Sequence, residues 1–132
     1  MEQNLENKSV RDPILEAAKK IPGLVLYKNP VGRGKVKTAD GRYEQWITYG
    51  LQPGSADLIG YYTMDLSGLN VAVFVSIETK RPHGGHTAEA QRKWRDKVIE
   101  RGGIALITND PEEFMRVFSD GRAWERVRGL VK

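Results

Sequence analysis

The chain has 132 residues, of which 39% are hydrophobic, and this balance fits one compact domain and excludes a disordered chain. It contains no cysteine, which excludes disulfides, thiolate zinc sites and cysteine nucleophiles. The formal net charge is +4, from 21 Lys+Arg against 17 Asp+Glu, so the position of the basic groups matters more than their sum. No apolar run reaches the roughly 18 residues of a membrane span, and the polar N-terminus does not resemble a signal peptide. We therefore expect a cytoplasmic protein without membrane contact.

The first predicted helix begins at Asp12, which serves as its N-cap, with Pro13 at the first helical position. Apolar residues then recur at helical spacing as far as Ile21, and Pro22 and Gly23 end the helix. Residues 24–27 read as a short strand that follows directly.

Residues 29–54 are rich in Gly, Lys and Arg, and Asp40-Gly41 predicts a hairpin turn within them. Tyr43, Trp46 and Tyr49 are interspersed in this segment. They fit two interpretations equally well: stacking on unpaired bases, or the alternation of a half-buried hairpin.

Two more strands are predicted at residues 57–63 and 71–80, and the Ser67-Gly68 turn between them makes them antiparallel neighbours. A helix over residues 87–101 follows, and Gly102-Gly103 ends it. Its predicted buried stripe consists of Ala90, Trp94, Val98 and Ile99.

The C-terminal part begins with a buried strand at residues 104–108. A short helix over residues 111–118 has Asp110 as its N-cap, and the tail containing Trp124 and Val127 is expected to be helical. The resulting order predicts an α/β fold with a mixed central sheet flanked by helices on both faces. We expect a single domain over residues 1–132 with its core at about residues 12–118.

The chemistry is expected at three residues near the ends of two adjacent strands. Asp57 closes the glycine-rich turn of residues 54–60, and Glu78 and Lys80 end the second strand. Side chains two apart in a strand share a face, so Glu78 and Lys80 point the same way. Two carboxylates suffice for Mg²⁺ or Mn²⁺, the backbone carbonyl of Thr79 offers another oxygen, and Lys80 can orient a water or offset phosphate charge. This set predicts phosphodiester hydrolysis. A turn cap at Asp57 and a surface pair at the strand end are the structural alternatives.

Several further residues are candidates for the same site. Gln91, near the start of the following helix, can orient a water or contact a phosphate, and Glu16 can turn inward from the first helix as an extra metal ligand. An ordinary exposed side chain is the alternative for each. His83 and His86 flank two glycines, and a solvated loop explains them better than metal binding does.

Basic residues gather in two clusters that flank this candidate site, and such clusters attract phosphate backbones. The alternative is a solvated surface. The predicted nucleic-acid contacts are Arg33, Lys35, Lys37, Arg42, Arg81, Arg92 and Lys93.

At these residues the chain resembles the PD-(D/E)xK nuclease superfamily, and more narrowly its VRR-NUC type in the stand-alone, phage-like form. The resemblance is carried by residues 54–60, by Ile77 to Pro82, by Gln91 to Trp94 and by Gly102-Gly103 before a buried strand. It runs from about residue 54 to residue 109. Ala56 stands where the superfamily has a loop-shaping proline, which is no ligand.

The resemblance implies a restriction-endonuclease-like αβββαβ core and a metal-dependent DNA endonuclease of a bacterial or phage-infected cell. It implies Asp57 and Glu78 as metal ligands, Lys80 as the catalytic lysine and Gln91 as the additional motif residue. The resemblance also implies a homodimer, with branched DNA, including Holliday junctions, as the substrate. Two other functions stay open: a DNA-binding module of the same fold without cleavage, and a nuclease that acts on single strands.

Overall fold

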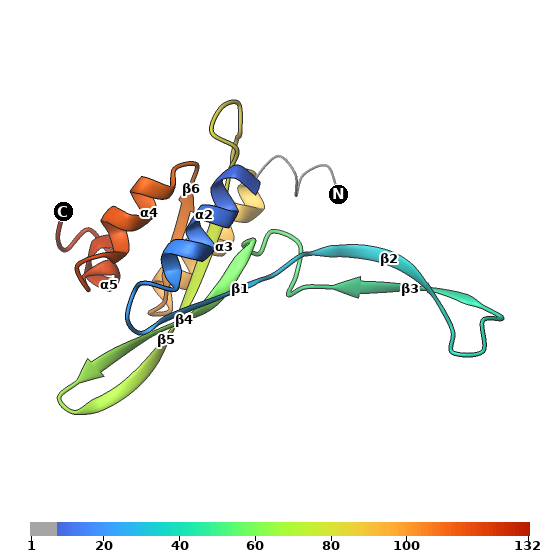
Figure 1. The fold of residues 1–132 in the computed structure, drawn as a ribbon, viewed down its shortest axis with the longest axis horizontal. Coiled ribbons are helices and arrows are strands. Elements are labelled where there is room, and N and C mark those ends of the chain that lie inside the picture. The colour runs from blue at the N-terminus through green and yellow to red at the C-terminus, as the bar shows by residue number, and fades with distance from the viewer. Residues whose placement is uncertain (1–7) are drawn as a thin grey trace.

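A four-stranded mixed sheet forms the centre of the computed structural model, which describes residues 8–132 (Figure 1). The strands run in the order β1-β4-β5-β6, where the β1–β4 and β4–β5 pairs are antiparallel and the β5–β6 pair is parallel. They span Leu24–Lys28 (β1), Leu58–Leu66 (β4), Leu69–Thr79 (β5) and Ile104–Thr108 (β6). The predicted α/β class with a mixed sheet is confirmed.

Helices cover both faces of this sheet, as predicted. Val75 and Ile77 of β5 point to one face, where they join the hydrophobic core with α2 (Lys8–Ala18) and α4 (Pro111–Phe118). The residues of β5 that alternate with these two in sequence, such as Ser76, point to the other face. There Trp94 of α3 (Glu89–Glu100) donates a hydrogen bond to Ser76 at 2.8 Å. The short helix α5 (Ala123–Val127) packs beside β6.

Helix α2 begins four residues earlier than the sequence predicts, so the expected start at Asp12 is wrong. Pro13 lies inside the helix, although proline removes a backbone hydrogen bond there. Val10 provides the reason, because it lies one turn before Ile14 on the same face and is buried with it. Burial of Val10 extends the helix past the proline. The buried cluster includes residues from Val10 to Ala123.

The β4–β5 hairpin is longer than predicted. Its two strands pair from Leu58 to the turn at Ser67-Gly68, and both turn residues have positive φ (55° and 90°), as in the twisted two-residue turns of hairpins. Strand β4 starts at Leu58, which leaves Asp57 in the loop before the strand.

Helix α3 matches the predicted helix within two residues at each end, but its predicted buried stripe is only partly correct. Trp94, Val98 and Ile99 are half-buried, whereas Ala90 is exposed and no residue of α3 is fully buried. Helix α3 packs on β5 and β6. Phe74 of β5 remains 39% exposed there, although its ring meets that of Trp94 edge-on.

The predicted hairpin of the Gly/Lys/Arg-rich segment is present as an arm that projects away from the sheet (Figure 1). We call β2 (Gly32–Lys37) and β3 (Glu44–Tyr49) with their turn the β-arm. The two strands pair only with each other. Within residues 8–132, no helix is long and apolar enough to cross a bilayer.

Candidate active site

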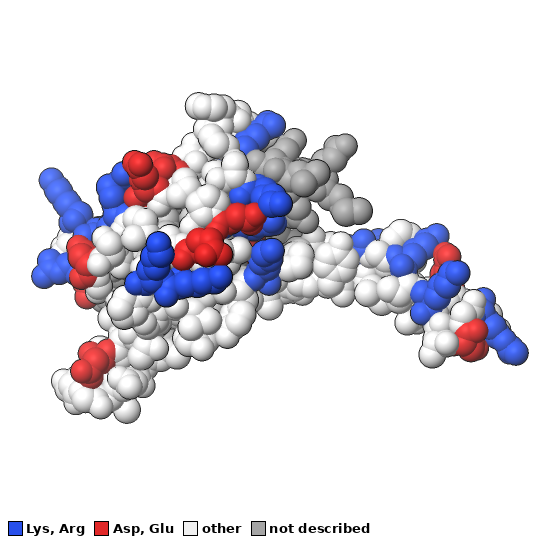
Figure 2. Space-filling model, viewed as in Figure 1, with Lys and Arg blue, Asp and Glu red and all other residues white. Residues whose placement is uncertain are grey.

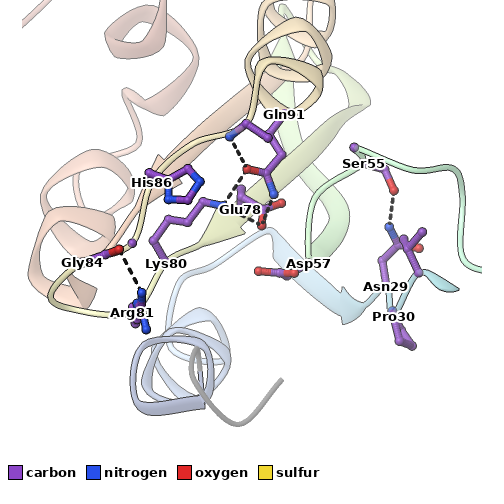
Figure 3. Close-up of a pocket in the computed structure, with 14 residues that line it drawn as sticks. Asn29, Pro30, Ser55, Asp57, Glu78, Lys80, Arg81, Gly84, His86 and Gln91 are labelled. Carbon is purple, nitrogen blue, oxygen red and sulfur yellow. Dashed lines mark hydrogen bonds and ion pairs between the residues drawn. The ribbon is translucent and has the colours of Figure 1, made fainter. Parts of the chain in front are cut away.

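A pocket of about 390 Å³ opens at the C-terminal end of β5, next to the first turn of α3. Asp57, Glu78, Lys80 and Gln91 all line it, and Figure 3 shows the four side chains around one space. They come from three places in the chain: the loop before β4, the end of β5 and the start of α3. The fold thus brings together the residues that the sequence singled out.

Gln91 connects the acid and the amine of the site. Its Oε1 accepts a hydrogen bond from Lys80 Nζ at 2.6 Å and another from the backbone N–H of Ala88 at 3.1 Å, and its Nε2 donates to Glu78 Oε1 at 3.2 Å. This arrangement requires Glu78 and Lys80 on the α3 face of β5, which the two-residue period of the strand provides. Gln91 therefore positions both groups.

Glu78 is a buried carboxyl group, with 5% of its surface exposed. Burial is the main cause that raises its pKa to about 8, and the nearby Asp57 carboxylate adds to the shift, while Lys80, whose Nζ lies 3.9 Å from Glu78 Oε1, opposes it. Glu78 Oε2 is buried and has no hydrogen-bond partner within the described part of the chain. A buried carboxyl group with an unpartnered oxygen is stabilised by binding either a proton or a cation.

Asp57 is held in place by Thr79. Its Oδ2 accepts hydrogen bonds from the backbone N–H of Thr79 at 3.0 Å and from the Thr79 hydroxyl at 2.8 Å. Both bonds go to Oδ2, so Oδ1 takes part in neither of them. The sequence pointed only to the carbonyl oxygen of Thr79, a role that stays a prediction. The hydroxyl was missed, since a Thr between Glu78 and Lys80 looks like an ordinary strand residue.

Asn29 fixes the loop that carries Asp57, and sequence reasoning missed it entirely. Its buried side-chain amide donates to Ser55 Oγ at 3.0 Å and to the carbonyl of Ala56 at 2.8 Å, and it accepts from the N–H of Leu51 at 3.1 Å. Its own N–H donates to the carbonyl of Asp57 at 2.7 Å. The only sequence signal was an Asn-Pro pair, which reads as a turn.

Gly54 lets this loop approach α3. Its φ is +89°, and a Cβ at this position would lie 2.9 Å from the Cβ of Ala90. Any side chain would therefore both strain the backbone and push the Asp57 loop away from the first turn of α3.

The donor set fits a hard divalent cation. Asp57 and Glu78 are two carboxylates at one pocket, one with an unpartnered oxygen, and Mg²⁺ uses one or two carboxylates and keeps several waters. No group of three or more His, Cys, Asp or Glu that could hold a metal occurs among residues 8–132.

Glu16 lies outside the pocket, and of the two alternatives for this residue the structure shows the exposed helical side chain. Its side chain is 72% exposed and pairs with Lys19 Nζ at 3.0 Å. It lies two residues from Ile14 on a helix, so it points away from the buried stripe of α2. Of the two histidines, His86 lines the pocket and His83 lies in the exposed loop outside it.

The predicted basic contacts divide into three places. Arg81 lines the pocket and donates to the carbonyl of Gly84 at 3.1 Å. Arg92 and Lys93 are exposed on the first turns of α3, where Lys93 pairs with Glu89. The remaining four lie on the β-arm, at one end of the molecule in Figure 2. These four are Arg33, Lys35, Lys37 and Arg42.

Comparisons of the chain with protein-family models, with curated proteins and with solved structures found no match. The assignment to the VRR-NUC type therefore rests on the sequence motifs and stays a prediction.

Proposed function

We propose that this protein is a Mg²⁺- or Mn²⁺-dependent DNA endonuclease with a restriction-endonuclease-like core of the VRR-NUC type. The observation that carries the proposal is the convergence of Asp57, Glu78, Lys80 and Gln91 on one open pocket. The order α2-β1-β4-β5-α3-β6 is the αβββαβ order expected of such a core, with the β-arm inserted after β1.

Asp57 and Glu78 are the residues that would hold the cation, with the Thr79 carbonyl as a further candidate. The bound cation would acidify a water and stabilise negative charge on the phosphate. Lys80 places its ammonium group next to Glu78, where it offsets the charge that develops on the reacting phosphate. Gln91 keeps Lys80 and Glu78 in this arrangement through its three hydrogen bonds. Thr79 does the same for Asp57.

The proposal is tested on a panel of duplex, flap, four-way-junction and single-stranded DNA, with and without Mn²⁺. Wild type should cut at least one of these DNA substrates only when the metal is present. Asp57→Ala should abolish cleavage, and Lys80→Ala should lower the rate by at least about a hundredfold, because each removes a group that acts on the reacting phosphate. Glu112→Gln, an exposed carboxylate on α4, is the matched control and should cut as wild type does. Cleavage by Asp57→Ala at the wild-type rate would refute the mechanism.

Two further parts of the proposal concern the substrate and the assembly. A homodimer would place two such pockets on two strands of a junction, so the proposal includes branched DNA as its substrate. If sedimentation shows that the protein stays monomeric on junction DNA at working concentration, the proposal of a homodimer acting on a junction is wrong. A DNA-binding module without cleavage is the competing function, and it would take up no Mn²⁺ through Asp57 and Glu78.

A further inference from the structure

The β-arm has two chemically different faces. Residues directly opposite in an antiparallel pair share a face. The register therefore places Arg33, Lys35 and Lys37 of β2 on one face together with Thr48, Trp46 and Glu44 of β3. The other face carries no charge and consists of Gly32, Gly34, Val36, Gln45, Ile47 and Tyr49. We call the first of these the basic face.

Contacts within the β-arm hold the basic face in a defined shape. The Arg33 guanidinium lies 4.7 Å from the centre of the Trp46 ring, and Lys35 Nζ lies 5.2 Å from it. These cation–π contacts hold two charges on one indole. On the uncharged face the ring of Tyr49 lies against Gly32 and Gly34, and an aromatic ring over strand glycines supports a ribbon that has little else to pack on.

The basic face is exposed. All residues of β3 are exposed, Trp46 by 58%, and within residues 8–132 the one ion pair on this face joins Lys35 to Glu44 at 4.0 Å. An isolated two-stranded hairpin is marginal in water, and an exposed cationic ribbon has its natural counterpart in an anionic partner.

The base of the β-arm adjoins the candidate active site. Asn29, Pro30 and Val31, which lead into β2, line the same pocket as Asp57 and Glu78. Asn29 also bonds to the loop that follows β3. Six residues at about 3.4 Å each extend roughly 20 Å, so the arm reaches about six base pairs from a phosphate bound in the pocket.

We propose that the β-arm lies in the major groove of duplex DNA, with its basic face on the phosphates that border the groove. The major groove admits a two-stranded β-ribbon. Duplex is favoured over unpaired bases because the Arg33 and Lys35 cations lie over the Trp46 ring, so this ring orients charges that can meet the phosphates bordering a groove. This inference takes its ligand, DNA, from the proposed function but needs neither metal nor cleavage.

The test measures binding without cleavage. A labelled duplex of about three helical turns, and one of its strands, are titrated in EDTA by fluorescence anisotropy between about 50 and 200 mM salt. The test variant combines Arg33→Gln, Lys35→Gln and Lys37→Gln. The charge-matched control combines Lys19→Gln and Lys20→Gln, in the turn after α2, with Arg116→Gln on α4. Val36→Thr is a control on the uncharged face of the arm.

Each phosphate contact contributes about 0.9 to the slope of log K against log salt. The arm variant should therefore lose roughly 2.7 from the duplex slope and bind duplex at least about tenfold more weakly, while both controls bind as wild type does. Unchanged thermal unfolding of the core and unchanged Mn²⁺ uptake exclude misfolding as the cause. Equal slopes for the arm variant and the charge-matched control would overturn the inference, as would an equal loss on single strands.

The two proposals fail separately. If wild type takes up no Mn²⁺ and cuts nothing, yet the arm variant shows the expected loss, the proposed function fails and the β-arm inference stands. If metal-dependent cleavage is present but the duplex slope does not depend on the arm, only the inference fails.

Discussion

At the scale of single residues, Glu78 is a carboxyl group removed from water. Its carboxyl is buried, faces Asp57 and has an unpartnered oxygen, and its pKa of about 8 is the physical result. Lys80, 3.9 Å away, only partly compensates these effects. The same features that make an ionised Glu78 costly in the metal-free protein make it a strong ligand for a cation.

This pKa predicts how stability depends on pH in EDTA. The folded protein holds the Glu78 proton up to about pH 8, whereas an unfolded glutamate loses it near pH 4.5, so the free energy of unfolding should fall as the pH rises between these values. Each pKa unit corresponds to about 1.4 kcal/mol, so the fall should amount to a few kcal/mol. Glu78→Gln should remove this dependence and be the more stable form near pH 8. Urea unfolding of both proteins from about pH 5 to about pH 9 measures it, and parallel pH profiles would contradict the account of Glu78.

Thr79 provides a second residue-scale prediction, because its hydroxyl donates a hydrogen bond to Asp57, one of the two proposed metal ligands. Thr79→Val keeps the shape of the side chain and removes the hydrogen bond, so Mn²⁺ affinity should fall by about ten- to a hundredfold. Thr79→Ser restores the hydroxyl and is the matched control. Calorimetric titration with Mn²⁺ compares the three proteins. Equal affinities for the Val and Ser variants would show that this bond does not prepare Asp57.

At the scale of elements, Asn29 connects the base of the β-arm to the Asp57 loop through four hydrogen bonds. Asn29→Ala leaves buried polar partners unpaired and should destabilise the protein by about 1–3 kcal/mol. Asn109→Ala is the control, since that exposed side chain makes one bond of 3.3 Å to the carbonyl of Pro82 and should change stability by less than about 0.5 kcal/mol. Urea unfolding of both variants measures the change in free energy of unfolding. Equal changes in the two variants would show that Asn29 does not support the site.

The strands and helices α3 and α4 follow from local patterns, and these elements were predictable. Strand β6, helix α4 with its Asp110 cap, and the Ser67-Gly68 turn lie where the sequence places them. Helix α2 was not predictable in its bounds, because it spans Lys8–Ala18 where the sequence predicts Asp12 to about Ile21. Tertiary packing sets its start through the burial of Val10, and Ala90 of α3 is exposed although it has the spacing of a buried stripe.

The candidate site shows the same division. Asp57, Glu78, Lys80 and Gln91 were found because their motifs are short and local. Asn29 and the Thr79 hydroxyl act across gaps of more than twenty residues, which no pattern in the sequence encodes.

At the scale of the whole molecule, the two proposals concern two separate parts of the fold. The mixed sheet with its helices holds the pocket, and the β-arm projects from the edge of that pocket and carries exposed basic side chains (Figures 1 and 2). If both proposals hold, DNA binding and catalysis can be altered one at a time, so variants of the arm and of the pocket give independent answers.

The central claim is that Asp57 and Glu78 share one cation, and calorimetric titration of the protein with Mn²⁺ tests it most directly. We predict saturable uptake by wild type that is lost in Asp57→Asn and in Glu78→Gln and kept in Glu112→Gln. Uptake that persists unchanged in both pocket variants, or no uptake by wild type, would contradict the account.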